Sequence, residues 1–184
     1  MKLLALSTQN CSIKDTTILW AIDVDTKMLI KAYVKSKMIR GISVGDCIDA
    51  QINANGKRQE VNIEKIDEVL SFEGDLDEYL ETKAATPYSV ERPSFVGNIA
   101  KIEEIIAIEK NTVKARLYGF PKELFYLSIF DDKWNSYWSN EAMDSDCISK
   151  TIECFNKRKD KYIIIDFPYD ELKGYVAVAA LVVR

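Results

Sequence analysis

The apolar stretch from Tyr175 to Val183 is hydrophobic on both of its alternating faces. Gly174 precedes it, and neither alternating set of positions in YVAVAALVV contains a charge. Because a strand without a polar face has other elements packed on both sides, this pattern predicts a buried β-strand that forms a hairpin with the segment beginning at Tyr162. The valines favour a strand over a helix, and the stretch is too short to cross a bilayer as a helix.

The first part of the chain alternates between apolar and polar residues, as half-buried strands do. A short strand is expected from Lys2 to Ser7. The next two strands are joined by a turn at Asp25-Thr26. Their apolar positions are Ile18, Trp20, Ile22 and Val24 in one, and Met28, Ile30, Ala32 and Val34 on the inner face of the other.

Two further strands complete this pattern. The first follows a turn at Val44-Gly45-Asp46 and has Ile48, Ala50 and Ile52 inward. The second follows the turn signal Asn55-Gly56 and runs from Glu60 to about Leu70. Its apolar phase slips at Ile66, which indicates a bulge. Five short strands with such turns predict a small barrel.

The pattern changes between Ser71 and Pro93. Leu76, Tyr79 and Leu80 have helical spacing in an acidic segment, and two prolines bracket an extended connector. We therefore expect a first barrel over residues 1–75, a connector over 76–93 and a second barrel over 94–184.

Beyond the connector the strand pattern returns. Strands are expected at Gly97 to Ile108, Thr112 to Tyr118 and Glu123 to Phe130, before the closing hairpin. Ahead of that hairpin, Ile148, Ile152 and Phe155 recur at i, i+4 and i+7, which predicts a helix with Asp144 or Ser145 as its N-cap. The basic run from Lys157 to Lys161 is interpreted as its solvated end. The chain is therefore expected to be mainly β, with two small barrels and one or two short helices.

The overall charge argues against a protein that coats nucleic acid indiscriminately. The chain of 184 residues carries 25 Lys and Arg against 29 Asp and Glu, a formal charge of -4. A local basic patch is compatible with this total. The chain has no histidine, which removes the commonest general base and the commonest metal ligand.

The four cysteines, Cys11, Cys47, Cys147 and Cys154, are widely separated and form no zinc-binding spacing. The apolar run near the N-terminus is too short for the core of a signal peptide. We expect reduced, mostly buried thiols in a cytoplasmic protein, with no metal and no cofactor.

Two strand faces combine rings with cations. Lys31, Tyr33 and Lys35 alternate on one strand, with Lys37 and Arg40 just beyond. The second half repeats the pattern; its members are Lys114, Arg116 and Tyr118. Rings that stack bases and cations that pair phosphates are what single-stranded nucleic acid binding needs. The alternative is a solvated outer face.

Other candidate groups have weaker chemical signals. Trp134, Tyr137 and Trp138 are either a base-stacking platform or a lid over the barrel. The nearby carboxylates, Asp131, Asp132, Asp144 and Asp146, lack the spacing of a calcium loop and are interpreted as caps and turns. Because no phosphate loop, nucleophile elbow or kinase-like set is present, we do not expect an enzyme.

Two stretches of the second half, TVKARLYGFPKELFYLSIFDDKWNSYW and YIIIDFPYDELKGYVAVAALVV, resemble the dual OB-containing domain family of bacterial and phage proteins. Leu127, Ser128, Ile129 and Asp131 match that family's turn after a strand pair, and Gly174-Tyr175 matches the start of its last strand. MLIKAYV, VGDCIDAQI and RQEVNIEK fit its first half more loosely. The family's basic N-terminal loop retains only Lys14 here, Lys31 replaces an Arg, Phe130 a Thr and Asp132 a Pro.

The resemblance implies two tandem OB-like barrels, packed together, without a recognised catalytic residue, in a defence or mobile-element setting. We therefore expect a non-enzymatic module that binds nucleic acid or a nucleotide, possible partners being a single strand or a protein encoded nearby, and no membrane. The alternative is an adaptor or inhibitor that acts on a partner effector protein. The strand faces with Lys and Tyr favour nucleic acid, whereas the acidic total and the weakened basic loop favour the adaptor.

Overall fold

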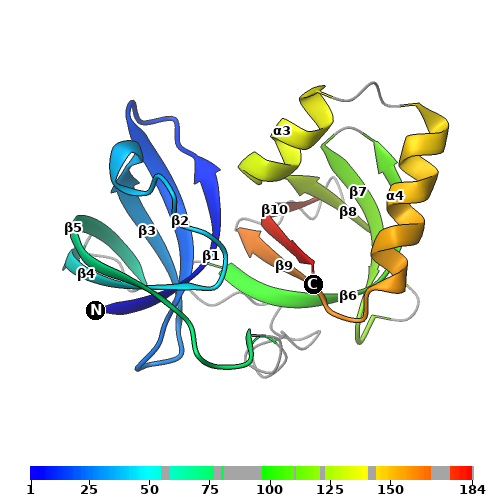
Figure 1. Ribbon diagram of the computed structural model, residues 1–184. Helices are drawn as coiled ribbons and strands as arrows, with labels where there is room; N and C mark the ends of the chain where they lie inside the picture. The colour runs from blue at the N-terminus through cyan, green and yellow to red at the C-terminus, as the bar shows by residue number, and fades with distance from the viewer. Residues whose placement is uncertain are drawn as a thin grey trace. The chain divides into compact units, whose positions relative to one another are not determined.

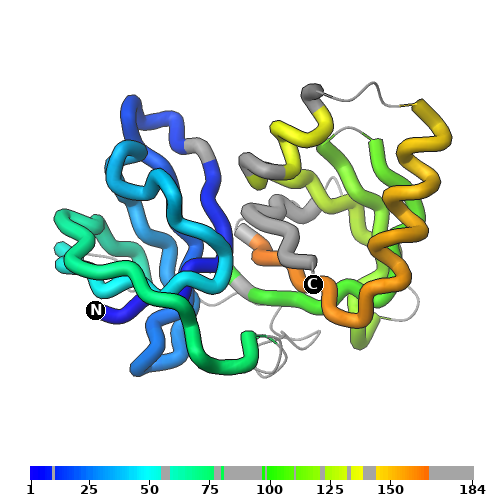
Figure 2. Tube along the Cα trace, in the orientation of Figure 1, coloured from blue at the N-terminus to red at the C-terminus, as the bar shows by residue number. Residues whose placement is uncertain are grey.

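The chain divides into two compact units, Met1–Leu76 and Asp77–Arg184 (Figures 1 and 2). The computed structural model describes residues 1–54, 59–76, 80, 97–109, 111–120, 123–140, 144–166 and 175–183. Each unit has its own closed barrel, so each is described in turn.

The first unit is a five-stranded barrel closed in the order β1-β2-β3-β5-β4 (Figure 1). Its strands are β1 (Lys2–Asn10), β2 (Thr16–Asp23), β3 (Leu29–Lys35), β4 (Asp46–Ala54) and β5 (Glu60–Ser71), with the short 3-10 turn η1 (Ser36–Met38) after β3. All neighbouring strands are antiparallel except β3 and β5, which pair in parallel. A meander whose third strand pairs with the fifth is the Greek-key arrangement of the OB fold, and the expected barrel is confirmed.

The alternating faces of the strands separate core from surface. Leu19 and Ala21 supply the barrel core from β2, together with inward residues of β3 and β4. Ile18, Trp20 and Ile22 lie on the opposite side of β2 and are also buried. This strand is therefore covered on both faces, which explains why its sequence is apolar throughout.

The slip of the apolar phase at Ile66 corresponds to two irregularities in the ladder between β4 and β5. Ala50 pairs with Ile66, and the register shifts on either side of that pair, between Asp49 and Ala50 and between Gln51 and Ile52. Extra residues on β5 let Val61 and Ile63 remain inward although the alternation is broken. The turn predicted at Asn55-Gly56 lies outside the described residues.

The second unit repeats the same strand order. Its elements are β6 (Gly97–Glu109), β7 (Thr112–Leu117), β8 (Phe125–Ile129), α3 (Asp132–Asn140), α4 (Ser145–Lys157), β9 (Lys161–Asp166) and β10 (Tyr175–Val183). The barrel closes as β10-β8-β7-β6-β9, in which the third strand again pairs in parallel with the fifth. Both units are thus OB-like, and the second carries two helices between its third and fourth strands.

The apolar stretch that ends the second barrel is a strand, as predicted. β10 pairs in parallel with β8 and antiparallel with β9, so it has a neighbour on each edge and forms the expected hairpin with β9. The side chains of β10 lie outside the described residues, and burial of both its faces stays a prediction.

The predicted helix is α4, which begins after Asp144. The Asp144 carboxylate accepts a hydrogen bond from the backbone N–H of Cys147 at 2.6 Å, and thus caps the helix. Ile148, Ile152 and Phe155 pack against the barrel core. At the other end, Lys157 to Lys159 are exposed as expected, but Lys161 is only 3% exposed, so the interpretation of the whole basic run as solvated is wrong for this residue.

Helix α3 forms the lid that the aromatic residues suggested. Asp131 caps it by accepting a hydrogen bond from the backbone N–H of Trp134 at 2.9 Å. Trp134 and Trp138 are buried in the core of the second barrel, with ring centroids 5.6 Å apart, and Trp134 stacks on Phe155 of α4. Tyr137 is about half exposed. The lid interpretation is confirmed for the two tryptophans.

The predicted connector lies outside the described residues except at its start, where Leu76 and Leu80 are buried.

Candidate nucleic-acid interface

The first candidate group lies on the outer side of β3. Ile30, Ala32 and Val34 point into the barrel core, so Lys31, Tyr33 and Lys35 take the other side of the strand. Lys31 pairs across the ladder with Trp20 of β2, and its Nζ lies 5.1 Å from the centroid of the Trp20 ring. This cation–π contact holds Lys31 against the sheet. Lys35, at the end of the strand, is exposed.

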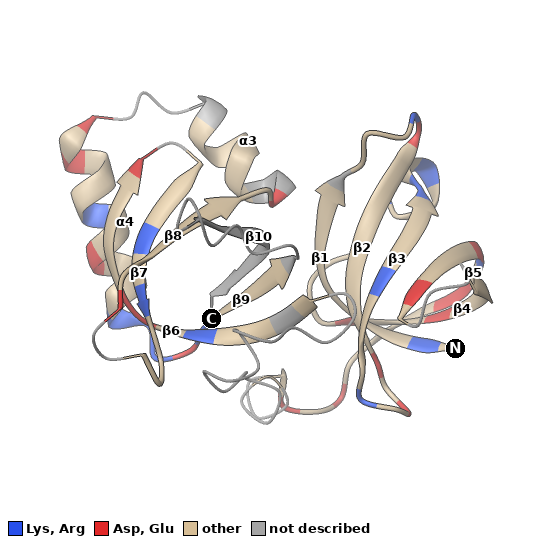
Figure 3. Ribbon diagram, turned by 180° about the vertical axis from the view of Figure 1, so that it is seen from behind, with Lys and Arg blue, Asp and Glu red and all other residues tan. Residues whose placement is uncertain are grey.

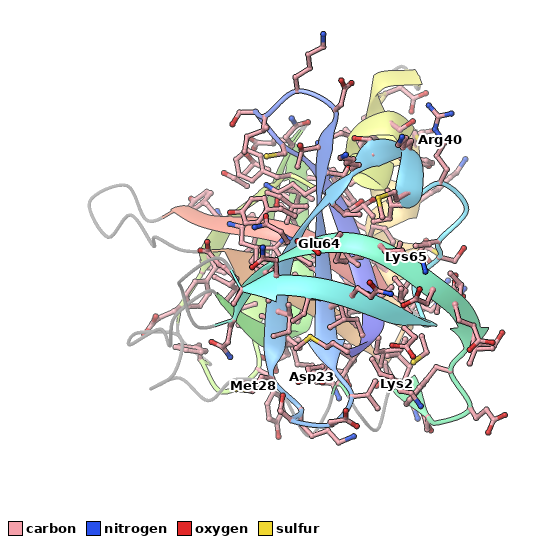
Figure 4. All side chains as sticks on the ribbon, turned by 90° about the vertical axis from the view of Figure 1, so that its left-hand side faces the viewer. Lys2, Asp23, Met28, Arg40, Glu64 and Lys65 are labelled. Atoms are coloured by element: carbon pink, nitrogen blue, oxygen red, sulfur yellow. The ribbon has the colours of Figure 1, made fainter. Side chains whose placement is uncertain are left out.

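Further cations gather where β3 ends. Lys37 and Arg40 are exposed in and after η1, and Lys14 is exposed in the turn between β1 and β2. That turn is fixed beside η1 because the backbone N–H of Ser36 donates to the Asp15 carbonyl at 2.9 Å. Figure 4 shows Arg40 at the end of the barrel opposite Asp23 and Met28. Alternation along the sequence had not placed Lys14 in this group, because its position depends on that contact between loops.

We call these residues the basic face: Lys14, Lys31, Tyr33, Lys35, Lys37 and Arg40. Within the part of the chain that the structure describes, the side chains of Lys14, Lys35, Lys37 and Arg40 form no ion pair or hydrogen bond. Their charges are therefore available to an anionic ligand. Figure 3 shows blue Lys and Arg positions along β3 and in the loops beside its end. Tyr33, which lies next to Asn62 of β5, offers a ring among them.

Charges on β4 and β5 are arranged differently. Lys65 forms an ion pair with Asp67, and the Gln51 amide also donates to that carboxylate, at 2.9 Å. The hydrogen bond from Lys65, followed by that from Gln51, lowers the pKa of Asp67 below its usual value. Because this lysine is already paired, it is less suited than those of the basic face to bind a phosphate.

The second candidate group lies on the outer side of β7. Lys114 and Arg116 alternate with the core residues Val113, Ala115 and Leu117. Arg116 forms an ion pair with Glu104 of β6, its cross-strand partner. The Arg116 guanidinium therefore already has an anionic partner within the protein, although both side chains are exposed.

The neighbouring strand adds rings that sequence reasoning missed. Lys114 lies opposite Tyr126 of β8, with its Nζ 5.4 Å from the ring centroid. Tyr118, Tyr126 and Phe130 are 69%, 39% and 48% exposed. The period-two alternation of β8 was the available signal, because it predicts Tyr126 and Phe130 on the side opposite the core residues Phe125, Leu127 and Ile129. We call Lys114, Tyr118, Tyr126 and Phe130 the ring face.

The described residues hold no group of three or more His, Cys, Asp and Glu side chains placed to bind a metal ion. All four cysteines are free thiols; Cys11, Cys47 and Cys147 are half-buried and Cys154 is exposed. Three of the four thiols are therefore largely covered, and the expectation of mostly buried thiols is wrong for Cys154. Within the described ranges, no helix combines the length and the apolarity that crossing a bilayer requires.

No family model matches the chain, and no curated protein matches it in sequence. Among solved structures, the p204 HINb domain is similar over 100% of this chain and 96% of its own, with 7% identity and a TM-score of 0.46. The Ifi202 HINa domain in complex with 20-bp dsDNA is 9% identical over 100% and 94%, with a TM-score of 0.43. A murine DNA-binding protein bound with dsDNA is 9% identical over 100% and 97%, with a TM-score of 0.41. At these values the similarity assigns no ligand to this chain.

Proposed function

We propose that this protein is a non-enzymatic module that binds nucleic acid or a nucleotide over the basic face. One observation supports this most directly: near the end of β3, the strand that carries Tyr33, four exposed cations have no ion pair or hydrogen bond of their side chains to any described residue. Cations of this kind pair with phosphates and release counterions, while an aromatic ring stacks a base. The negative total charge argues against indiscriminate binding over the rest of the surface.

The proposal extends to the strand form and the setting. Tyr33 can contribute to binding by stacking on a base only if that base is unpaired. We therefore propose a single strand, and not a duplex, as the ligand. The resemblance to the dual OB-containing domain family supports a bacterial or phage protein of the cytoplasm that serves a defence or mobile-element system.

Titration of a labelled single-stranded oligonucleotide tests the proposal. Tyr33→Ala should weaken binding by about 1–3 kcal/mol, the usual contribution of one stacked base. Lys35→Ala and Lys37→Ala should each reduce the slope of log K against log salt by about 0.7, because each removes one phosphate contact. Lys65→Ala is the matched control, since it removes a lysine already paired with Asp67, and it should leave affinity and slope unchanged.

The proposal fails if wild-type protein binds neither DNA nor RNA at about 10⁻⁴ M, where non-specific binding is ordinarily detectable. That outcome favours an adaptor that contacts a protein. A specific observation supports this second candidate: Val69 and Leu70, successive residues near the end of β5, are 46% and 50% exposed, although their side chains alternate between the two faces of the strand. Exposed apolar side chains at the end of a strand can contribute to a protein contact, and the basic face would then border an acidic partner.

A further inference from the structure

Among the described strands, only β4 lies beside the second half of β5. β3 pairs with β5 as far as Ile63, whereas the ladder between β4 and β5 continues to Ser71. The segment from Glu64 to Ser71 therefore has a described strand on one edge and none on the other, which we call the free edge. Figure 4 shows Glu64 and Lys65, where this segment begins.

The backbone groups along the free edge are open to a further strand. The Phe72 N–H donates to the Gly45 carbonyl at 3.2 Å, so it points toward β4. Because successive residues of a strand direct their N–H and C=O groups to opposite edges, those of Val69 and Ser71 point away from β4. Among the described residues, the backbone of this segment forms no hydrogen bond outside the ladder with β4. Every residue of the segment except Ile66 is exposed.

The last four residues of β5 are the part of the free edge best suited to pairing. Register shifts interrupt the ladder on both sides of Ile66, whereas the last four residues pair with β4 without interruption. Glu68 and Leu70 lie on one side of the strand, and Val69 lies on the other. Since Val69 and Leu70 are each about half exposed, both sides offer an apolar group to a neighbouring strand.

The charges along this segment determine which kind of strand it accepts. Residues Glu64 to Asp75 contain five carboxylates and one lysine, Lys65, which is paired with Asp67. In the described part of the chain, Glu68 and Glu73 form no ion pair. A strand that places a cation beside Glu68 creates a cross-strand pair of opposite charges, which is stabilising.

The same charges disfavour a second copy of this chain as the added strand. Antiparallel pairing of the segment from Glu64 to Ser71 with itself, residue against residue, would put Asp67 opposite Glu68 twice. Like charges directly opposite each other are destabilising, and charged residues and bulges are the devices by which natural edge strands avoid self-association. The free edge is thus protected against its own sequence and complementary to a basic one.

We infer that the free edge of β5 is a docking site for an extended, basic segment of a partner protein, which adds to the sheet as a further strand. Main-chain hydrogen bonds to Val69 and Ser71 supply affinity, and alternate side chains supply specificity. The complementary segment alternates Lys or Arg with Val or Ile. Its cations lie beside Glu68, their aliphatic stems cover Leu70, and its apolar side chains lie beside Val69. Because this surface shares no residue with the basic face, the inference stands whether or not the basic face binds nucleic acid.

The test titrates a labelled peptide of about ten residues, in which lysine and valine alternate, against the full chain. Salt is held at about 0.15 M, so that attraction between distant exposed charges is screened. The control peptide has the same sequence but is N-methylated at every residue. It keeps the charge and cannot donate main-chain hydrogen bonds.

Three variants locate the contact. Glu68→Lys should weaken binding of the peptide about fivefold or more, because it replaces a pair of opposite charges by like charges. Val69→Pro removes an N–H of the free edge, a position where strands tolerate proline, and should weaken binding about tenfold or more. Glu103→Lys, at an exposed position of β6 in the second barrel, makes the same change in net charge and should leave affinity unchanged. Circular dichroism checks that each variant is folded; if Val69→Pro is not, Glu68→Lys and the two peptides decide the question.

The inference is supported if wild-type protein binds the peptide but not its N-methylated form, and if Glu68→Lys weakens binding while Glu103→Lys does not. It is overturned if both peptides bind equally, since main-chain pairing is then absent. Equal effects of the two charge reversals overturn it too, since net charge alone then attracts the peptide, as does a wild-type protein that binds neither peptide. A dimer in analytical ultracentrifugation that Val69→Pro dissociates would also overturn it, because a second copy then occupies the edge.

Discussion

Lys161 is a charged side chain in a place where charge is costly. It is 3% exposed at the start of β9, and its Nζ donates to the Arg158 carbonyl at 2.7 Å. Burial lowers its pKa; Asp160 opposes that shift and Lys101 adds to it. A single carbonyl acceptor does not replace the water that the ammonium group loses on folding.

This burial predicts a pH dependence of stability. Because the folded-state pKa lies below the unfolded value of about 10.4, the unfolded state holds the proton more tightly as pH rises between those two values. The penalty is fully present below the folded pKa and is relieved above it. The unfolding free energy of the wild type should therefore rise relative to that of Lys161→Met as the pH increases toward about 10.

Urea denaturation at several pH values measures this difference. Lys159→Met, which removes an exposed lysine two positions earlier, should differ from wild type by an amount that does not change with pH. A constant difference for Lys161→Met as well would show that its folded-state pKa is ordinary.

One side chain of helix α4, Asn156, hydrogen-bonds to the backbone of the second barrel. The Asn156 amide donates to the Ile105 carbonyl at 2.7 Å, and its Oδ1 accepts from the Ile105 N–H at 2.8 Å. β6 pairs with β9 only over Gly97 to Lys101, so Ile105 lies beyond the end of that ladder. Asn156 thus supplies the donor and the acceptor that a neighbouring strand would have provided.

Removal of this amide should destabilise the second barrel. Asn156→Ala leaves both backbone groups of the buried Ile105 without their partner, and we expect a loss of about 1–3 kcal/mol in the free energy of unfolding. Ser149→Ala, at an exposed position of the same helix whose hydroxyl bonds only within α4, should change stability by less than about 0.5 kcal/mol. Equal, small effects of the two substitutions in urea denaturation would contradict the role assigned to Asn156.

Elements whose pattern is local were predictable, and those that depend on distant contacts were not. The strands follow from alternation, and α4 follows from Ile148, Ile152 and Phe155. Helix α3 is short and mostly polar, so its stability comes from two tryptophans that pack into the core of the second barrel. That tertiary contact could not be read from the local sequence. The ring face was missed for a related reason. Tyr126 belongs to it because it lies opposite Lys114, and this pairing depends on the register between β7 and β8.

At the scale of the whole molecule, the reactivity of the four thiols tests the structure of both barrels. All are free, but they differ in environment: Cys154 is exposed on α4, whereas Cys47 on β4 is half-buried and burial raises its pKa. Since the thiolate is the reactive form, native protein should be alkylated fastest at Cys154 and slowly at Cys47.

Mass spectrometry provides the measurement. After denaturation without reductant, all four cysteines should be modified, and Cys154→Ser should remove the fastest phase seen in the native state. Two fewer modifications would reveal a disulfide and contradict the structure.

The parallel pairing of β10 with β8 has a consequence for biosynthesis. Tyr175 is made 46 residues after Ile129, the last residue of β8, so a ribosome adding about 5–20 residues per second needs about 2–9 s to produce the missing partner. During that interval the second barrel remains open on one edge of β8, while every strand of the first barrel has already been synthesised. The second half of the nascent chain is therefore most exposed to wrong strand pairing, and the unpaired edge of β8 is the place where a chaperone would protect it.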